Sequence, residues 1–356
     1  MRARKTVAGL LAAGLMLTAP MPALAMGDVE KTLLGGLIYM TVAKSYLNEQ
    51  HLNGQAETLA ESQKATGVSH DPAANQLLER ISSRLTPAVG APKVPFVFYV
   101  NPRKDFNASC GLSNVVTVNI GTFDAMNWNE DESAMVVAHE MAHGMGNHVM
   151  KNYNKTLGLN LLYALYASKN RNELSWLMGL SATRMITAKA YVLPDEWEAD
   201  NNGYGYFVAA GYNPGAPAAS FIRVKAKYGD AGRNFLGELI QPNDHPTNSQ
   251  RIENFSKKMT EYSGGRVNVA GAAVRIKGQD FLTAQAGDGQ LPDERAYLIA
   301  GQLSRYFHDR PGGSGNAWVN EAGQVMIEDY PVLTPASGEP AAGELAERLQ
   351  ELIRRP

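Results

Sequence analysis

The sequence predicts an α+β fold: a mainly helical domain with a small antiparallel sheet, followed by a small C-terminal α+β domain. Two short β-rich runs, at residues 95–100 and 114–120, lie among longer segments whose apolar residues recur every three or four positions, as in helices. A Ser-Gly-Gly stretch at 263–265 then breaks the chain. We therefore expect one domain over residues 26–262 and an accessory domain over residues 266–356.

Length and composition are those of a globular protein with a sizeable core. The chain has 356 residues, of which 44% are hydrophobic and 19% are charged. The formal net charge is −2 and no basic stripe stands out, which argues against a nucleic-acid partner. A single cysteine, Cys110, has no partner for an intramolecular disulfide, and we expect it to be a small buried residue.

Residues 1–25 have the pattern of a secretory signal peptide. Three positive charges within the first five residues precede an apolar stretch at 8–19, and Ala23-Leu24-Ala25 is a small-x-small cleavage site. The apolar stretch is too short to span a bilayer comfortably. We therefore expect cleavage after Ala25 and an exported protein, either periplasmic or secreted.

Apolar periodicity and turn residues predict the order of the remaining elements. These are helices at 33–47 and 73–85, strands at 95–100 and 114–120, helices at 157–167, 174–193 and 194–211, a polar helical stretch to about 262, strands at 267–269 and 274–276, a helix at 294–308, a hairpin at 318–327 and a helix at 344–355. Charged and polar residues within 157–193 favour buried helices covering a cleft over membrane-dipping segments. Residues 266–356 contain no constellation of catalytic type, so we expect them to serve in binding, tethering or packing.

The most informative stretch is residues 136–144. His139 and His143 are four positions apart, so on a helix their rings point to the same side, as one tetrahedral zinc ion requires of two imidazoles. Glu140 is rotated by about 100° from His139, where its carboxylate can reach a water molecule on the metal without binding the metal. Asn129 followed by Glu132 is a capping-box arrangement that would start this helix.

A hydrolytic zinc ion needs a third protein ligand and an open position. A third histidine six positions after His143 would fall at residue 149, which is Val149. His148 is one position short and rotated by about 100°, so we expect it to be a polar residue at a helix end. The alternative is a carboxylate on a second helix. Glu196 and Asp200 share one face, so one can bind zinc while the other accepts a hydrogen bond from a ligand histidine.

These patterns together resemble the M48 family of zinc metallopeptidases, gluzincins that include bacterial periplasmic quality-control proteases and membrane CAAX prenyl proteases. The resemblance covers roughly residues 40–256. It rests on His139-Glu140-Met141-Ala142-His143 with His148, on residues 196–203 and 210–214, on Asn107-Ala108-Ser109 before a strand, and on His245-Pro246 with Arg251. Leu193-Pro194 departs from the Ser-Arg that many members carry upstream of the ligand glutamate.

The resemblance implies a zincin-like metallopeptidase domain that binds one Zn²⁺ per chain. Its ligands would be His139, His143 and Glu196, and Glu140 would be the general base. These four side chains would then form the reactive centre.

Three further residues receive roles from the same resemblance. Asp200 would accept a hydrogen bond from a ligand histidine. His245 and Arg251 would lie over the cleft and stabilise the oxyanion, or His245 could instead cap the zinc in a latent form.

Three functions compete at this stage. The first is a zinc metalloendopeptidase acting on exported, unfolded or misfolded polypeptides, which could pair with the open edge of the strand at 114–120. The second is a zinc-stabilised periplasmic chaperone or scaffold with latent or no proteolytic activity. The third is an assembly factor associated with the membrane surface or with envelope proteins through the apolar 157–193 region. The sequence does not indicate an oligomeric state.

Overall fold

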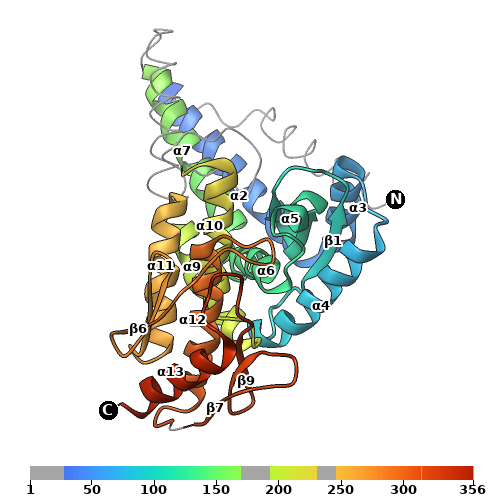
Figure 1. The fold of residues 1–356 in the computed structure, drawn as a ribbon. Helices are drawn as coiled ribbons and strands as arrows, with labels where there is room; N and C mark the ends of the chain where they lie inside the picture. The colour runs from blue at the N-terminus through green and yellow to red at the C-terminus, as the bar shows by residue number, and fades with distance from the viewer. Residues whose placement is uncertain (1–27, 170–192, 231–245, 314, 356) are drawn as a thin grey trace.

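A computed structural model describes residues 28–169, 193–230, 246–313 and 315–355 (Figure 1). The predicted signal peptide, most of the second apolar segment and His245 lie outside these described residues. Helices dominate and the sheets are small, which confirms the predicted mainly helical α+β class. None of the helices within the described ranges combines the length and the apolar character needed to cross a bilayer.

The N-terminal sheet has three short strands: β1 (Val97–Asn101), β2 (Ala108–Cys110) and β3 (Val115–Asn119). Their order is β1-β3-β2, with β1 parallel and β2 antiparallel to β3, so this sheet is mixed. The expectation of an open edge on the strand at 114–120 is wrong, because β3 is the central strand. The edges of this sheet belong to β1 and β2.

The helices α2 (Asp28–Asn53), α3 (Gln55–Thr66) and α4 (Pro72–Val89) precede the sheet. The predicted helix at 73–85 is confirmed as α4, which begins after Asp71, whose side chain accepts a hydrogen bond from the Ala74 backbone N–H. Its apolar face is fully inside the protein, as the spacing of three and four requires. The buried residues of this face are Ala74, Leu77, Leu78, Ile81, Leu85 and Val89.

Two helices at the centre of the molecule carry the candidate site, α6 (Glu130–Met145) and α9 (Leu193–Ala209), and they pack against each other. A short 3-10 turn (Leu112–Asn114) and α5 (Ile120–Ala125) flank β3, and α7 (His148–Lys169) follows α6. Helix α7 forms the first of the two predicted apolar helices. It runs beside α2, and the pair projects from the body at the top of Figure 1.

The rest of the chain continues from α9, and its first helix, α10, packs on α6 (Figure 1). It comprises α10 (Ala216–Tyr228), α11 (Asn248–Tyr262), β4 (Val267–Ala270), β5 (Ala273–Ile276), β6 (Gln279–Thr283), α12 (Pro292–Asp309), β7 (Ala317–Val319), β8 (Val325–Ile327), β9 (Tyr330–Leu333) and α13 (Ala342–Arg354). The strands form two antiparallel three-stranded sheets, β4-β5-β6 and β7-β8-β9.

The two halves of the chain share one apolar core. Helix α12 packs on α10, and a side-chain carbon at Gly215 or Gly301 would collide with backbone of the other segment. A buried polar cluster joins α10 and α12 to α6: Arg223 of α10 contacts Glu132 of α6 at 3.0 Å and also Glu294 of α12. The boundary at residues 263–265 between two domains, 26–262 and 266–356, therefore stays a prediction.

Candidate metal centre

Helix α6 begins as its sequence predicts and is buried along most of its length. The Asn129 side chain accepts a hydrogen bond from the Glu132 backbone N–H at 3.0 Å. The predicted capping box is only half formed, because the Glu132 carboxylate turns inward to Arg223. Residues 132–142 are all buried, including His139 and Glu140. Polar groups on such a helix need partners within the protein.

Helix α9 lies unusually close to α6 at the level of the histidines. A side-chain carbon at Gly203 would lie 3.1 Å from three backbone atoms of α6, the Ala138 oxygen and the nitrogen and Cα of His139. Ala199, one turn earlier, is completely buried. Two small residues therefore set the distance between the helices and bring the acidic face of α9 to the histidines.

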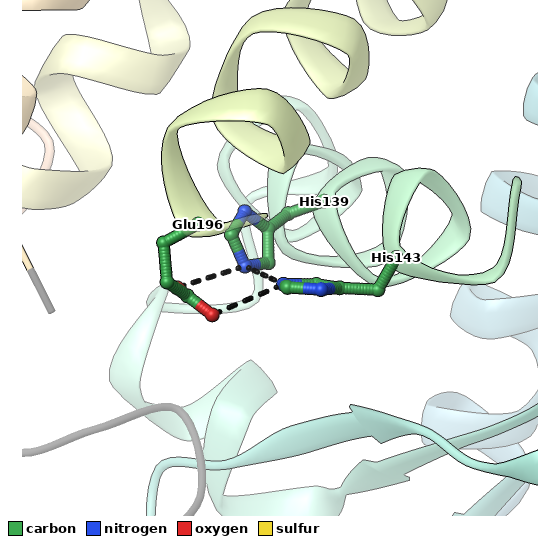
Figure 2. Close-up of side chains that lie close together, drawn as sticks. All are labelled: His139, His143 and Glu196. Carbon is green, nitrogen blue, oxygen red and sulfur yellow. Dashed lines mark hydrogen bonds and ion pairs between the residues drawn. The ribbon is translucent and has the colours of Figure 1, made fainter. Parts of the chain in front are cut away.

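Three ligand atoms converge from the two helices (Figure 2). The Nε2 atoms of His139 and His143 are 3.0 Å apart, and the Glu196 oxygens lie 3.5 Å from His139 Nε2 and 3.2 Å from His143 Nε2. A tetrahedral zinc ion with bonds of about 2.0–2.1 Å holds its ligand atoms about 3.3 Å apart. The spacing and the donor set of two imidazoles and a carboxylate both fit zinc.

Asp200 lies where a partner of a ligand histidine is needed. Its Oδ1 is 2.9 Å from Nδ1 of His139, so the His139 ring donates there and keeps Nε2 turned towards the other ligands. Burial lowers the pKa of His139, but the hydrogen bonds and charges of Asp200 and Glu196 raise it more, to about 10. The two carboxylates therefore favour a proton on His139, and a metal ion at Nε2 would compete with that proton.

Arg251 occupies a different place from the one expected. Its guanidinium is buried, with Nη2 at 2.6 Å from Glu196 Oε2 and Nε at 3.1 Å from Asp200 Oδ2. It also lies over the Phe221 ring. The expected position over the cleft is therefore corrected: the Arg251 cation is held against the two carboxylates of α9, and its companion His245 lies outside the described residues.

Glu140 lies on the side of α6 that faces the edge strand β2, near Cys110. It shares a helix face with Gly144, where a side-chain carbon would lie 3.0 Å from the Cys110 sulfur. Burial raises the pKa of the Cys110 thiol strongly, and the charge of Glu140 adds to this effect. Cys110 is thus the small buried residue expected from the sequence, and Glu140 lies between α6 and β2.

On the other side of His143 lies His148, the first residue of α7. The two Nδ1 atoms are 2.9 Å apart, and His148 Nε2 is 3.6 Å from an oxygen of Glu198. His148 is 2% exposed, so it is a helix-end residue as expected but a buried one. Burial lowers the pKa of His148, as does the neighbouring His143. Sequence reasoning missed this contact, for which the only signal was a third histidine close after His143.

The sequence model of peptidase family M48 matches residues 72–259, slightly more than half of the chain. The chain belongs to peptidase family M48. The match includes both helices of the candidate metal centre and most of α11, and it ends before the accessory unit, residues 266–356.

Two named proteins are similar to this M48 chain. It is 26% identical over 208 residues to a protein of Vibrio cholerae serotype O1 named as a beta-barrel assembly-enhancing protease, covering 55% of the chain and 41% of that protein. It is 27% identical over 168 residues to metalloprotease LoiP of Escherichia coli K12, covering 47% of the chain and 64% of LoiP. The chain thus spans less than two thirds of the length of each relative.

Proposed function

We propose that this M48 metallopeptidase is a zinc-dependent endopeptidase that hydrolyses peptide bonds of exported or misfolded proteins. The observation that carries the proposal is the meeting of His139, His143 and Glu196 at the spacing of a tetrahedral ion. Glu140, the next residue after the first ligand, lies on the side of α6 that faces an edge strand. Membership of the family supports the peptidase activity.

Each residue of the site would have its own role in peptide hydrolysis. His139, His143 and Glu196 would hold the zinc ion, and Asp200 would fix the His139 ring. When bound, zinc supplies a Lewis acid that polarises the scissile carbonyl and acidifies water. Glu140 would accept a proton as the water oxygen bonds to the carbonyl carbon. It would then deliver that proton to the amine nitrogen as the C–N bond breaks.

We assign Arg251 to charge compensation of Glu196 and Asp200, in keeping with its burial against both carboxylates. His245 stays a proposed donor to the oxyanion or a cap on the zinc in a latent form. Its replacement by alanine separates these roles, because loss of a cap raises hydrolysis whereas loss of a donor lowers it by about 10²-fold or more.

The proposed substrates follow from the export signal and from the sheet. A signal peptide at residues 1–25 would deliver the protein to the periplasm or outside the cell, and one relative is named for enhancing beta-barrel assembly. An extended segment of an unfolded client would add to the outer edge of β2, the edge strand nearest Glu140. Main-chain hydrogen bonds to that edge would make binding largely independent of sequence.

The decisive test compares wild type with Glu140→Gln. The variant should retain one zinc ion per chain and lose casein hydrolysis by about 10²–10⁴-fold, because it removes the proton acceptor but no ligand. Glu130→Gln, in the first turn of the same helix, should digest casein at the wild-type rate. Undiminished cleavage by Glu140→Gln would contradict the mechanism. The chaperone alternative would be favoured if the zinc-loaded wild type binds unfolded clients without cutting them and the His245→Ala variant does not cut them either.

A further inference from the structure

The contact between His143 and His148 limits where the protons of both rings can be. Their Nδ1 atoms are 2.9 Å apart, so one nitrogen donates and the other accepts. The Nε2 atom of His143 faces His139 and Glu196, and a metal ion held there takes its lone pair. A neutral His143 ring then carries its proton on Nδ1. His148 Nδ1 must therefore be the acceptor, with its own proton on Nε2.

The surroundings of His148 suit this tautomer. Its Nε2 is buried and lies 3.6 Å from an oxygen of Glu198. One ring nitrogen of His148 and oxygens of Glu198 and Asp195 lie within 4.8 Å of one another. Asp195 is also buried, and its Oδ2 has no hydrogen-bond partner in the described part of the chain. The Glu198 carboxylate stabilises a proton on Nε2, because the positive end of the N–H dipole points towards negative charge, and the nearby charge of Asp195 adds to this effect.

The same three groups have a spacing that could hold a second metal ion. A metal on His148 Nε2 would, however, leave the proton of a neutral His148 on Nδ1. Two N–H groups would then face each other across 2.9 Å whenever His143 holds the first ion. Lys155, 3.9 Å from Asp195, adds a positive charge beside the cluster. The contact between the two histidines is therefore compatible with only one metal.

The turn between α6 and α7 is shaped to bring the His148 ring back to His143. Asn147 adopts a left-handed conformation (φ 52°), which asparagine tolerates better than most residues. A side-chain carbon at Gly146 would collide with the His148 ring, so only glycine leaves room for it. Two consecutive residues thus position His148 beside a metal ligand.

We propose that His148 is a positioning residue for the zinc centre: its Nδ1 accepts the hydrogen bond of His143, and the carboxylates of Asp195 and Glu198 hold its proton on Nε2. This rests on the proposed zinc function. With this role for His148, both ligand histidines have an acceptor that fixes the proton on Nδ1: Asp200 for His139 and His148 for His143.

The experiment measures Zn²⁺ affinity of the full chain by chelator competition in three variants. His148→Leu fills the space but has no acceptor, and its zinc dissociation constant should rise about 10–100-fold. His148→Asn places an amide oxygen close to the position of Nδ1 and should recover most of that loss. Gly146→Ala should weaken zinc binding like His148→Leu, because it displaces the ring. His70→Leu, at an exposed site, is the control and should bind zinc as wild type does.

A second readout does not depend on any variant folding. Long-range ¹H–¹⁵N NMR of the zinc-loaded wild type should show His148 as the Nε2–H tautomer and His143 with its proton on Nδ1. An Nδ1–H tautomer at His148, two zinc ions per chain, or equal affinity losses in the Leu and Asn variants would overturn the inference. Casein hydrolysis by the same wild-type sample tests the proposed function separately, so the two can fail independently.

Discussion

Gly203→Ala should loosen the metal centre without touching any ligand. The added carbon would lie 3.1 Å from backbone atoms of Ala138 and His139, whereas ordinary contact starts at 3.4 Å. Backbone cannot rotate away as a side chain can, so α9 must move by about 0.3 Å or more. Overpacking of this kind costs about 1–3 kcal/mol, and alanine returns about 0.5–1 kcal/mol of helix propensity. We therefore expect a net loss of up to roughly 2.5 kcal/mol in the free energy of unfolding.

The same displacement moves Glu196 relative to the histidines, so zinc affinity should fall. Each 1.4 kcal/mol needed to restore the positions of the ligands would lower the affinity tenfold. Urea unfolding of the metal-free protein and chelator competition measure the two effects. Gly205→Ala is the matched control on the same helix, because a carbon there meets nothing within 4 Å. It should gain stability and keep its zinc affinity. A Gly203→Ala protein as stable and as tight-binding as Gly205→Ala would refute the reasoning.

Two further predictions concern buried charges. Burial and the charge of Glu294 raise the pKa of Glu132 to about 8, above its unfolded value of 4.5, so the folded state keeps a proton that the unfolded chain loses. The free energy of unfolding should therefore fall by about 1 kcal/mol per pH unit between pH 5 and 8. Glu132→Gln should remove this slope when the free energy is measured by urea unfolding at each pH. Plots of the free energy against pH that run parallel for wild type and variant would contradict the prediction. Arg251→Met leaves Glu196 and Asp200 buried without their cation and should cost about 3–5 kcal/mol in chelator, and less with zinc bound. An equal loss in both conditions would exclude charge compensation as the role of Arg251.

The predictions that succeeded depend on geometry within a single helix. The four-residue spacings of His139 and His143, and of Glu196 and Asp200, fix which side chains share a face whatever the rest of the fold does. The small size of Gly203 then indicates a close helix contact. Local sequence was therefore enough to bring together the three candidate ligands and the partner of His139.

The predictions that failed depend on contacts between distant segments. Arg251 reaches Glu196 because α11 packs near α9, and no local pattern specifies that packing. Strand β2 has only three residues, too few for its alternation to be recognised in the sequence. It nevertheless takes the edge that the sequence assigned to β3. His148 was set aside because it is out of phase with α6. The left-handed turn at Asn147 starts a new helix and removes that phase relation.

The charges of the centre explain why three separate helices meet there. Glu140, Glu196 and Asp200 bring three negative charges into a buried space, and Arg251 of α11 supplies one positive charge. A divalent ion bound between the histidines would supply the remaining two, so a zinc-loaded centre would be neutral. Without it, the proton on His139 restores part of the balance, at the pKa of about 10 that Asp200 and Glu196 impose. Neutrality lowers the cost of burying these groups, and it links metal binding to the packing of α6, α9 and α11.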